Sequence, residues 1–174
     1  NNAGGANKTK QITIEGLEKT FATNQMNYFV LSTELLEIIS ESNDGRIVNV
    51  ASNAHIGAEV DYENINSEKN FSAWTSYCVS KLMNIMFTYQ LSSIQDKVSA
   101  NVLHPGFVDT NIAGNEGNFI KYIVKLGAKM FARTVDSGAD SSIYLSTSDE
   151  VQNVSGKYFF KCKEIKSSRA SYNK

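Results

Sequence analysis

Apolar side chains recur along much of the chain every three or four positions, the spacing of amphipathic helices. Two long helices are expected, one over about residues 17–40 and one of about twenty residues beginning near Trp74. The period is set by Leu17, Phe21, Asn24, Tyr28, Leu31, Leu35 and Ile39, and then by Trp74, Tyr77, Cys78, Lys81, Leu82, Ile85, Met86 and Tyr89. Residues 13–16 offer a cap for the first helix, and two further helices are expected over residues 119–133 and 136–147.

Three shorter runs predict strands. Residues 46–52 and 98–104 are rich in β-branched and small apolar side chains, and residues 156–160 form a last short run. The first run has no charge after Arg46, as expected of a strand that is buried on both faces. Long helices alternating with such strands indicate an α/β protein with a doubly wound parallel sheet.

The composition fits one soluble globular domain over residues 1–174, with 41% hydrophobic and 20% charged residues. A net charge of -1 leaves no basic excess for a phosphate backbone, so nucleic acid is not an expected partner. Cys78 and Cys162 lack metal-ligand spacing and fit a reducing, cytoplasmic compartment. No apolar run approaches the ~20 residues of a membrane span, so no transmembrane segment is expected in this chain.

Tyr77 and Lys81 form the strongest candidate for chemistry. Four residues apart on a helix, they leave the same face and can act on one bound molecule. The pKa of a free tyrosine is about 10, and a nearby lysine cation lowers it by stabilising the phenolate. A shift of about three units takes roughly 4 kcal/mol of such stabilisation and would let Tyr77 give and take a proton near neutral pH. The spacing alone also describes an ordinary amphipathic helix edge.

Ser52 and residues 104–106 follow two strands and are expected at the same sheet edge.

The order of these features resembles the short-chain dehydrogenase/reductase family, most specifically its retinol-dehydrogenase-like branch. The likeness runs from Asn1 to about Glu164, and the gap of 25 positions between Ser52 and Tyr77 is also similar to that branch. It is carried by Asn-Asn-Ala-Gly at 1–4, Arg-Ile-Val-Asn-Val-Ala-Ser-Asn-Ala-His at 46–55, Tyr-Cys-Val-Ser-Lys-Leu-Met-Asn at 77–84, Leu-His-Pro-Gly-Phe-Val-Asp-Thr at 103–110 and Ser-Gly-Lys-Tyr-Phe at 155–159.

The resemblance implies a Rossmann-like fold and an oxidoreductase that uses NADP or NAD on a small lipophilic alcohol, aldehyde or ketone. Tyr77 would be the acid or base, Ser52 a hydrogen-bond donor to the substrate oxygen, and Lys81 a ligand of the nicotinamide ribose. Asn24 would match the helix asparagine that holds a water leading to Lys81. The cofactor contacts implied by the family are Asn1, Asn2, Ala3, Gly4, Tyr77, Lys81, Pro105, Gly106, Val108 and Thr110.

Family members begin with a strand and a glycine-rich turn that holds the pyrophosphate, and this sequence starts after that region. The chain is therefore expected to be the C-terminal part of one such domain, with an exposed apolar edge on the strand at residues 46–52. Three interpretations remain open: the C-terminal part of an oxidoreductase, a half that needs a complementing N-terminal chain, or a non-catalytic interaction module. Relatives also suggest a homodimer.

Two other features are weaker. His55 and His104 lack a metal-ligand pattern and are interpreted as hydrogen-bonded structural groups, so no metal is expected. Residues 119–126 are apolar on one face and basic on the other. They fit a packing helix, a lid over the substrate or a membrane-surface contact.

Overall fold

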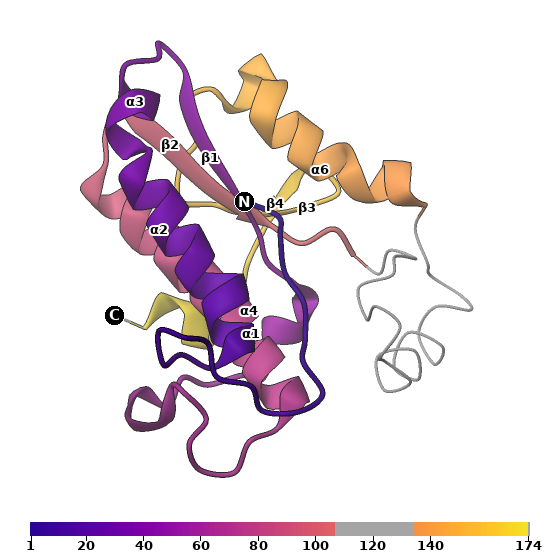
Figure 1. Cartoon of the computed structure of the whole chain (residues 1–174). Helices are drawn as coiled ribbons and strands as arrows, with labels where there is room; N and C mark the ends of the chain where they lie inside the picture. Colours follow the sequence, from indigo (N-terminus) through magenta and orange to yellow (C-terminus); the bar gives the residue numbers. More distant parts are fainter. Residues whose placement is uncertain (107–133, 174) are drawn as a thin grey trace.

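A four-stranded sheet forms the centre of the computed structural model, which describes residues 1–106 and 134–173 (Figure 1). The strands lie in the order β1 (Gly45–Val50), β2 (Val98–Leu103), β3 (Tyr158–Phe160) and β4 (Lys163–Ile165). β1, β2 and β3 are parallel, whereas β4 is antiparallel to β3. Val50 is paired with Leu103, so β1 and β2 end at the same edge of the sheet.

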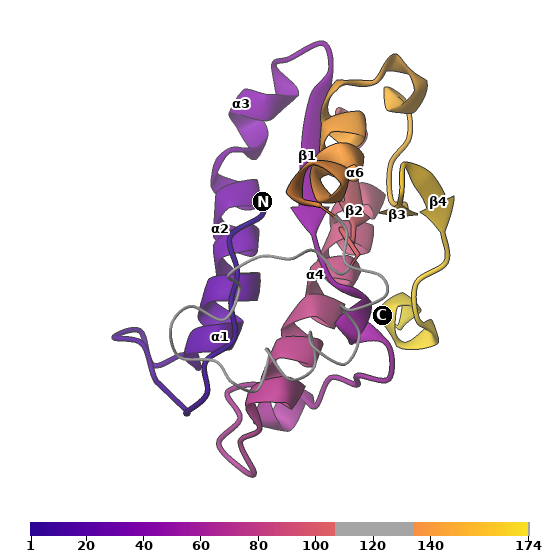
Figure 2. The same cartoon turned by 90° about the vertical axis from the view of Figure 1, so that its right-hand side faces the viewer.

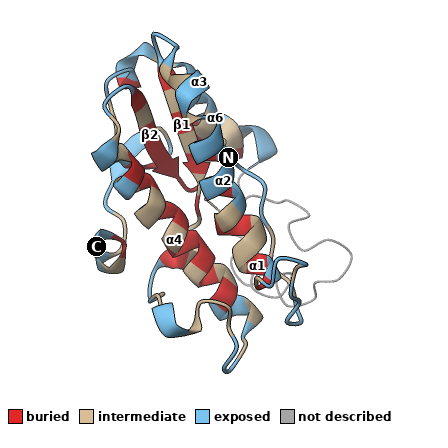
Figure 3. Cartoon of the chain, turned by 60° about the vertical axis from the view of Figure 1, so that its left-hand side comes forward, coloured by how far each residue is buried: buried red, intermediate tan, exposed pale blue. Residues whose placement is uncertain are grey.

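Helices cover both faces of this sheet (Figure 2). On one face α4 (Ala73–Ile94) and α3 (Leu36–Ser40) pack against Ile47, Val98 and Ala100 through Leu91 and three partly buried neighbours, Leu36, Ile39 and Phe87. On the other face α6 (Val135–Thr147) packs against Leu103 and Phe159 through Leu145. Figure 3 shows that buried residues concentrate in β1, β2 and α4.

The first long helix is interrupted where the sequence pattern suggested one continuous helix. It consists of α1 (Lys19–Phe21), a π-helical turn (Ala22–Met26), α2 (Asn27–Glu34) and α3. Its N-terminus is capped by Glu18, whose carboxylate accepts hydrogen bonds from the amides of Thr20 and Phe21 at 2.9 and 3.0 Å. The cap therefore lies at Glu18 and not within residues 13–16, because a buried carboxylate satisfies two free amides at once.

The other elements largely follow the sequence pattern. The expected strands at residues 46–52, 98–104 and 156–160 are confirmed with boundaries shifted by one or two residues, and so are α4 and α6. The helix expected over residues 119–133 lies outside the described residues. β4 was not expected, because its three residues are all exposed and show no alternation. Lys161 and Cys162 turn the chain with φ of 50° and 59°, a two-residue hairpin for which Asn-Gly is the usual sequence.

The outer edge of β1 is partly covered by the first residue of the chain. The backbone nitrogen of Asn1 donates to the Val48 carbonyl at 2.8 Å, and the Val50 amide donates to the Asn1 carbonyl at 2.9 Å. The Asn1 side chain also donates to Ser32 Oγ and Asn49 Oδ1. The expectation of an exposed edge along β1 is therefore wrong for the end of the strand nearest Ser52.

Gly45 begins β1 at a point of close approach. A Cβ atom there would lie 2.4 Å from the carbonyl oxygen of Ile39, which is backbone and cannot rotate away. We expect Gly45→Ala to lower the free energy of unfolding by about 1–3 kcal/mol in urea denaturation. Gly5→Ala is the matched control, since a Cβ there meets nothing within 4 Å. Equal unfolding midpoints for the two variants would contradict this packing.

Candidate active site

Ser52 lies just beyond the carboxyl end of β1. Its backbone is extended, and its hydroxyl accepts a hydrogen bond from the Ala54 amide at 3.2 Å, which caps the 3₁₀ turn Asn53–His55. The preceding amide, that of Ala51, donates to the Leu103 carbonyl at 2.7 Å and holds the chain against the end of β2. Ser52 therefore occupies the edge where ligands bind in parallel α/β sheets.

Tyr77 and Lys81 lie on α4 and reach this edge together. The Lys81 Nζ atom is 5.9 Å from the centre of the Tyr77 ring and 5.5 Å from the centre of the Tyr28 ring. Lys81 is only 4% exposed, and its ammonium donates to the Val50 carbonyl at 3.0 Å. The sequence spacing thus does bring the tyrosine, the lysine and the end of β1 to one place.

The pKa of Tyr77 is shifted in the direction opposite to the one expected. Burial raises this pKa above its ordinary value, the neighbouring Cys78 raises it slightly further, and a hydrogen bond with the Ser52 side chain lowers it without reversing the shift. The expectation that Lys81 brings Tyr77 close to neutrality is wrong for this arrangement. The physical reason is that burial of Tyr77 is the largest cause of the shift, and Lys81, whose ammonium donates to the Val50 carbonyl, is not among its causes.

Burial also acts on Lys81 itself. Removal from water disfavours the charged form and lowers the pKa of Lys81 to about 8. Within residues 1–106 and 134–173, no carboxylate pairs with this lysine. Lys81 is therefore a cation held in the interior by a carbonyl group and by the faces of two aromatic rings.

Asn24 is completely buried in the π-helical turn and ties three elements together. Its amide nitrogen donates to the Gly5 carbonyl and to Ser80 Oγ, both at 2.9 Å, and its oxygen accepts from the Gly5 amide at 2.8 Å. Ser80 Oγ in turn donates to the carbonyl of Tyr77 at 2.7 Å. Both amide donors of Asn24 thus have protein partners, so any water at this position would be bound by the backbone or by the remaining lone pair.

The loop at residues 1–5 packs directly on this group of side chains. A Cβ at Gly4 would lie 3.1 Å from Asn24 Oδ1 and 3.2 Å from Lys81 Nζ, so a side chain at this position would crowd both groups. Asn2 and Ala3 are exposed beside it. Of the residues expected after β2, Pro105 and Gly106 are described, and Gly106 has a φ of 84° that favours glycine. Val108, Thr110 and residues 119–126 lie outside the described part of the chain.

Two members of the site were not recognised from the sequence. Tyr28 donates its hydroxyl to the same Val50 carbonyl at 3.2 Å, and burial raises its pKa. Ser80 links Asn24 to Tyr77. Spacing could have found both, because Tyr28 follows Asn24 by four residues and Ser80 follows Tyr77 by three.

The two histidines are both held by neighbours. His55 is hydrogen-bonded at both ring nitrogens, and the His104 ring is stacked on Phe160 at 4.2 Å. Among the described residues no group of three His, Cys, Asp or Glu side chains gathers closely enough to hold a metal ion.

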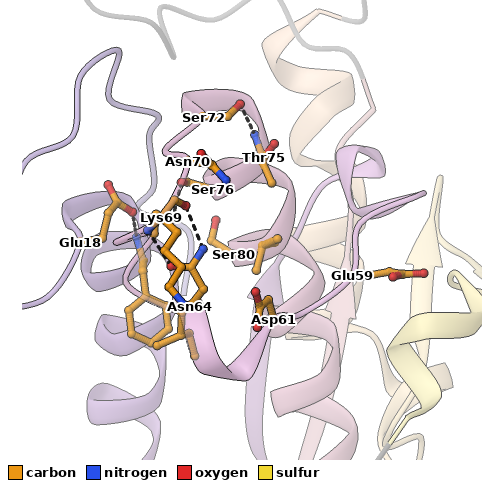
Figure 4. A pocket seen from close by; sticks show the side chains of 14 residues that line it. Glu18, Glu59, Asp61, Asn64, Lys69, Asn70, Ser72, Thr75, Ser76 and Ser80 are labelled. Atoms are coloured by element: carbon orange, nitrogen blue, oxygen red, sulfur yellow. Dashed lines mark hydrogen bonds between the residues drawn. The ribbon is translucent and has the colours of Figure 1, made fainter.

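A separate cavity of about 100 Å³ lies beside the N-terminal turns of α1 and α4 (Figure 4). It is lined mainly by polar side chains, including Glu18, Asp61, Asn64, Lys69 and Ser76. Ser80 also lines it, but Ser52, Tyr77 and Lys81 do not. The cavity is therefore a neighbour of the candidate site and not part of it.

A parallel sheet with helices on both faces and polar groups at its carboxyl edge defines a Rossmann-like α/β protein. The sequence model described as short chain dehydrogenase matches residues 1–120, and the chain belongs to this family. Human retinol dehydrogenase 14 is 37% identical over 168 residues, covering 94% of this chain and 50% of that protein. Human polyprenol dehydrogenase is 33% identical over 181 residues, covering 99% of this chain and 55% of that protein. The chain thus spans about half the length of these relatives.

Solved structures share the fold at lower identity. An uncharacterised protein from Mycobacterium paratuberculosis superposes with a TM-score of 0.67 at 22% identity, covering 95% of this chain and 56% of that one. A gluconate 5-dehydrogenase from Burkholderia cenocepacia, solved with NADP and tartrate, gives a TM-score of 0.64 at 18% identity, covering 91% and 60%. No helix in the described ranges is long and apolar enough to cross a membrane.

The low pKa of Lys81 predicts a specific dependence of stability on pH. Its folded value of about 8 lies below the ordinary value of 10.5. Between these values the unfolded chain holds a proton that the folded chain has lost, so the free energy of unfolding rises with pH in this window. We expect Lys81→Met to remove this rise. Its stability relative to wild type should therefore fall by about 3 kcal/mol between pH 7 and pH 10.5 in urea denaturation series.

Lys97→Met is the control, because the Lys97 side chain is exposed on the surface. It should follow the wild-type pH dependence. A parallel course for Lys81→Met and wild type would show that the lysine is not buried as a cation.

Proposed function

We propose that this chain carries the proton-transfer residues of an oxidoreductase that moves a hydride between NAD(P)(H) and a lipophilic alcohol, aldehyde or ketone. The observation that carries the proposal is the meeting of three groups at the carboxyl end of β1: Ser52 follows the strand, and Tyr77 and the buried Lys81 reach it from α4, where the Lys81 ammonium donates to the Val50 carbonyl. Groups with perturbed pKa values at such a sheet edge are typical of catalytic sites. The chain would form the C-terminal part of one Rossmann-type domain.

The proposed roles follow from what each group can donate or accept. In carbonyl reduction Tyr77 gives its hydroxyl proton to the substrate oxygen, while Ser52 donates a hydrogen bond to that oxygen as negative charge develops. In alcohol oxidation the same groups act in reverse, and Tyr77 accepts the proton. The nicotinamide, when bound, supplies or receives the hydride at the substrate carbon. Asn24 would act indirectly, by fixing the helix turn that carries Tyr77 through Ser80.

Several residues are suited to hold the dinucleotide. Gly4 lets the backbone of residues 1–4 lie close against Asn24 and Lys81, and a glycine in this loop would also let a ligand approach the backbone closely. Lys81 and Tyr77 would contact the nicotinamide ribose, and Pro105 and Gly106 would contact the nicotinamide. Asn1, Asn2, Ala3, Val108 and Thr110 complete the proposed set, the last two from the family resemblance alone.

The names of the relatives support a lipophilic substrate. The two human relatives are named for retinol and for polyprenol, which are alcohols with long apolar chains. An apolar substrate class is therefore proposed for the whole protein, with the particular alcohol or carbonyl compound left to be determined by assay.

A second candidate is that the chain works as a half that needs a complementing chain. It is favoured by apolar side chains on α2, on α3 and at the residue between them, which are between 43% and 66% exposed. These are Phe29, Val30, Leu31, Leu35 and Ile38. Calorimetric titration with NADPH separates the two candidates when the glycine-rich half of a relative is added as a separate polypeptide. A complementing half should then bind NADPH, whereas the C-terminal part of one continuous domain should bind it only when the two halves are joined in one polypeptide.

Tyr77→Phe tests the proposed function directly. In a polypeptide that joins the N-terminal half of retinol dehydrogenase 14 to this chain, we expect the variant to reduce retinal about 10²–10⁴-fold more slowly, because the proton donor is lost. NADPH affinity should stay within a factor of a few, which assigns the loss to the chemical step. Tyr62→Phe, an exposed tyrosine outside the site, is the control. Unchanged turnover in Tyr77→Phe would refute the role.

A further inference from the structure

His55 stands between the candidate site and the C-terminal segment of the chain. It is 1% exposed, and it ends the 3₁₀ turn that begins just after Ser52. Its Nδ1 atom lies 2.7 Å from the Ser52 carbonyl oxygen, and its Nε2 atom accepts a hydrogen bond from the Ser168 amide at 3.0 Å. One side chain therefore connects two segments that are 113 residues apart in sequence.

These two contacts determine which ring nitrogen carries the proton. The Ser168 amide can only donate, so Nε2 must offer a lone pair. The Ser52 carbonyl can only accept, so Nδ1 must carry the hydrogen. Both requirements are met by one neutral tautomer, and burial lowers the pKa of His55 in the direction that keeps the ring neutral.

The C-terminal segment that His55 contacts is itself held on α4, the helix that carries Tyr77. The Tyr89 hydroxyl is hydrogen-bonded to Ser167 Oγ at 2.8 Å, and the rings of Tyr89 and Tyr172 stack at 5.3 Å. Ser171 is buried and lies 2.6 Å from Ser167 through their hydroxyls. Through His55, the backbone of Ser52 is thus tied to a segment that rests on α4.

Apart from the His55 ring, few described contacts hold the carbonyl group of Ser52. Ser52 precedes a single 3₁₀ turn, and such short turns have poorer hydrogen-bond geometry than an α-helix. The Ser52 carbonyl accepts from the His55 amide at 3.2 Å, which is long, and from the His55 ring at 2.7 Å, which is short. The ring is therefore the stronger of the two described contacts that fix this peptide group.

We propose that His55 is a positioning residue for Ser52: by holding its carbonyl against the anchored C-terminal segment, it keeps the Ser52 hydroxyl in place beside Tyr77. The inference rests on the proposed function only in that Ser52 acts on the substrate. The connection itself is a property of the fold and can be measured in the chain without any substrate.

Two substitutions separate the two contacts of the ring. The amide nitrogen of Asn is as many bonds from the backbone as Nδ1, so His55→Asn retains a donor for the Ser52 carbonyl but does not reach Ser168. The amide of Gln extends to the position of Nε2, so His55→Gln retains an acceptor for Ser168 and loses the contact with Ser52. The pair forms a matched test, because each variant removes one buried hydrogen bond.

Hydrogen exchange on the chain gives a readout that does not depend on activity. In His55→Gln we expect the amides of residues 54 and 55 to exchange at least about tenfold faster than in wild type, with the α4 amides unchanged. In His55→Asn the faster exchange should instead appear at residue 168. Equal protection of residues 54 and 55 in His55→Gln and wild type would overturn the connection to Ser52.

Kinetics of the joined polypeptide test the positioning role. We expect His55→Gln to lower kcat about 10- to 100-fold, with little change in the KM for NADPH, whereas His55→Asn keeps most of kcat. In a Ser52→Ala background His55→Gln should have almost no further effect, since the group it positions is gone. Additive losses in the double variant would overturn the proposal in favour of a general structural role. No turnover in wild type would instead count against the proposed function and leave the exchange result to decide on His55.

Discussion

The carbonyl oxygen of Val50, at the end of β1, is the point on which the candidate site depends. This oxygen accepts hydrogen bonds from the Lys81 ammonium of α4 at 3.0 Å and from the Tyr28 hydroxyl of α2 at 3.2 Å. Two helices are thereby fixed to the same end of one strand. A buried cation that is met by a carbonyl and not by a carboxylate is costly, which is why burial lowers the pKa of Lys81 to about 8.

The rest of the contact between α2, α4 and β1 is also unusually polar. Asn24 bonds Ser80 near one end, and at the other end Asn49 bonds both Asn1 and Thr88. Such a layer holds the helices at one relative position, because each amide or hydroxyl must meet its partner to avoid an unpaired buried group. The π-helical turn serves the same purpose by placing Asn24 against Gly5 and Ser80 together.

The sequence predicted those features that are repeated along the chain, and missed those that are set by single contacts. α4 and the parallel strands were predictable because many residues share their period. β4 was not, since Lys163–Ile165 has no alternation and its turn uses Lys161 and Cys162 in place of the usual residues. Tyr77, Lys81 and Ser52 were named from order and spacing, and the structure brings them to one edge of the sheet. The direction of the Tyr77 pKa shift could not be predicted in that way, because it depends mainly on how deeply the tyrosine is buried.

That direction bears on how a proton could move at the site. A tyrosine with a raised pKa keeps its proton at neutral pH but gives it up less readily than one whose pKa lies near the working pH. If Tyr77 also acts as the base in alcohol oxidation, its phenolate needs a nearby positive charge. Lys81 is the cation closest at hand to supply that charge: its ammonium lies 5.9 Å from the Tyr77 ring centre while it donates to the Val50 carbonyl. The same ammonium is thus held by the Val50 carbonyl and lies beside the Tyr77 ring, so the contact that keeps the lysine charged in the interior also places its charge next to the tyrosine.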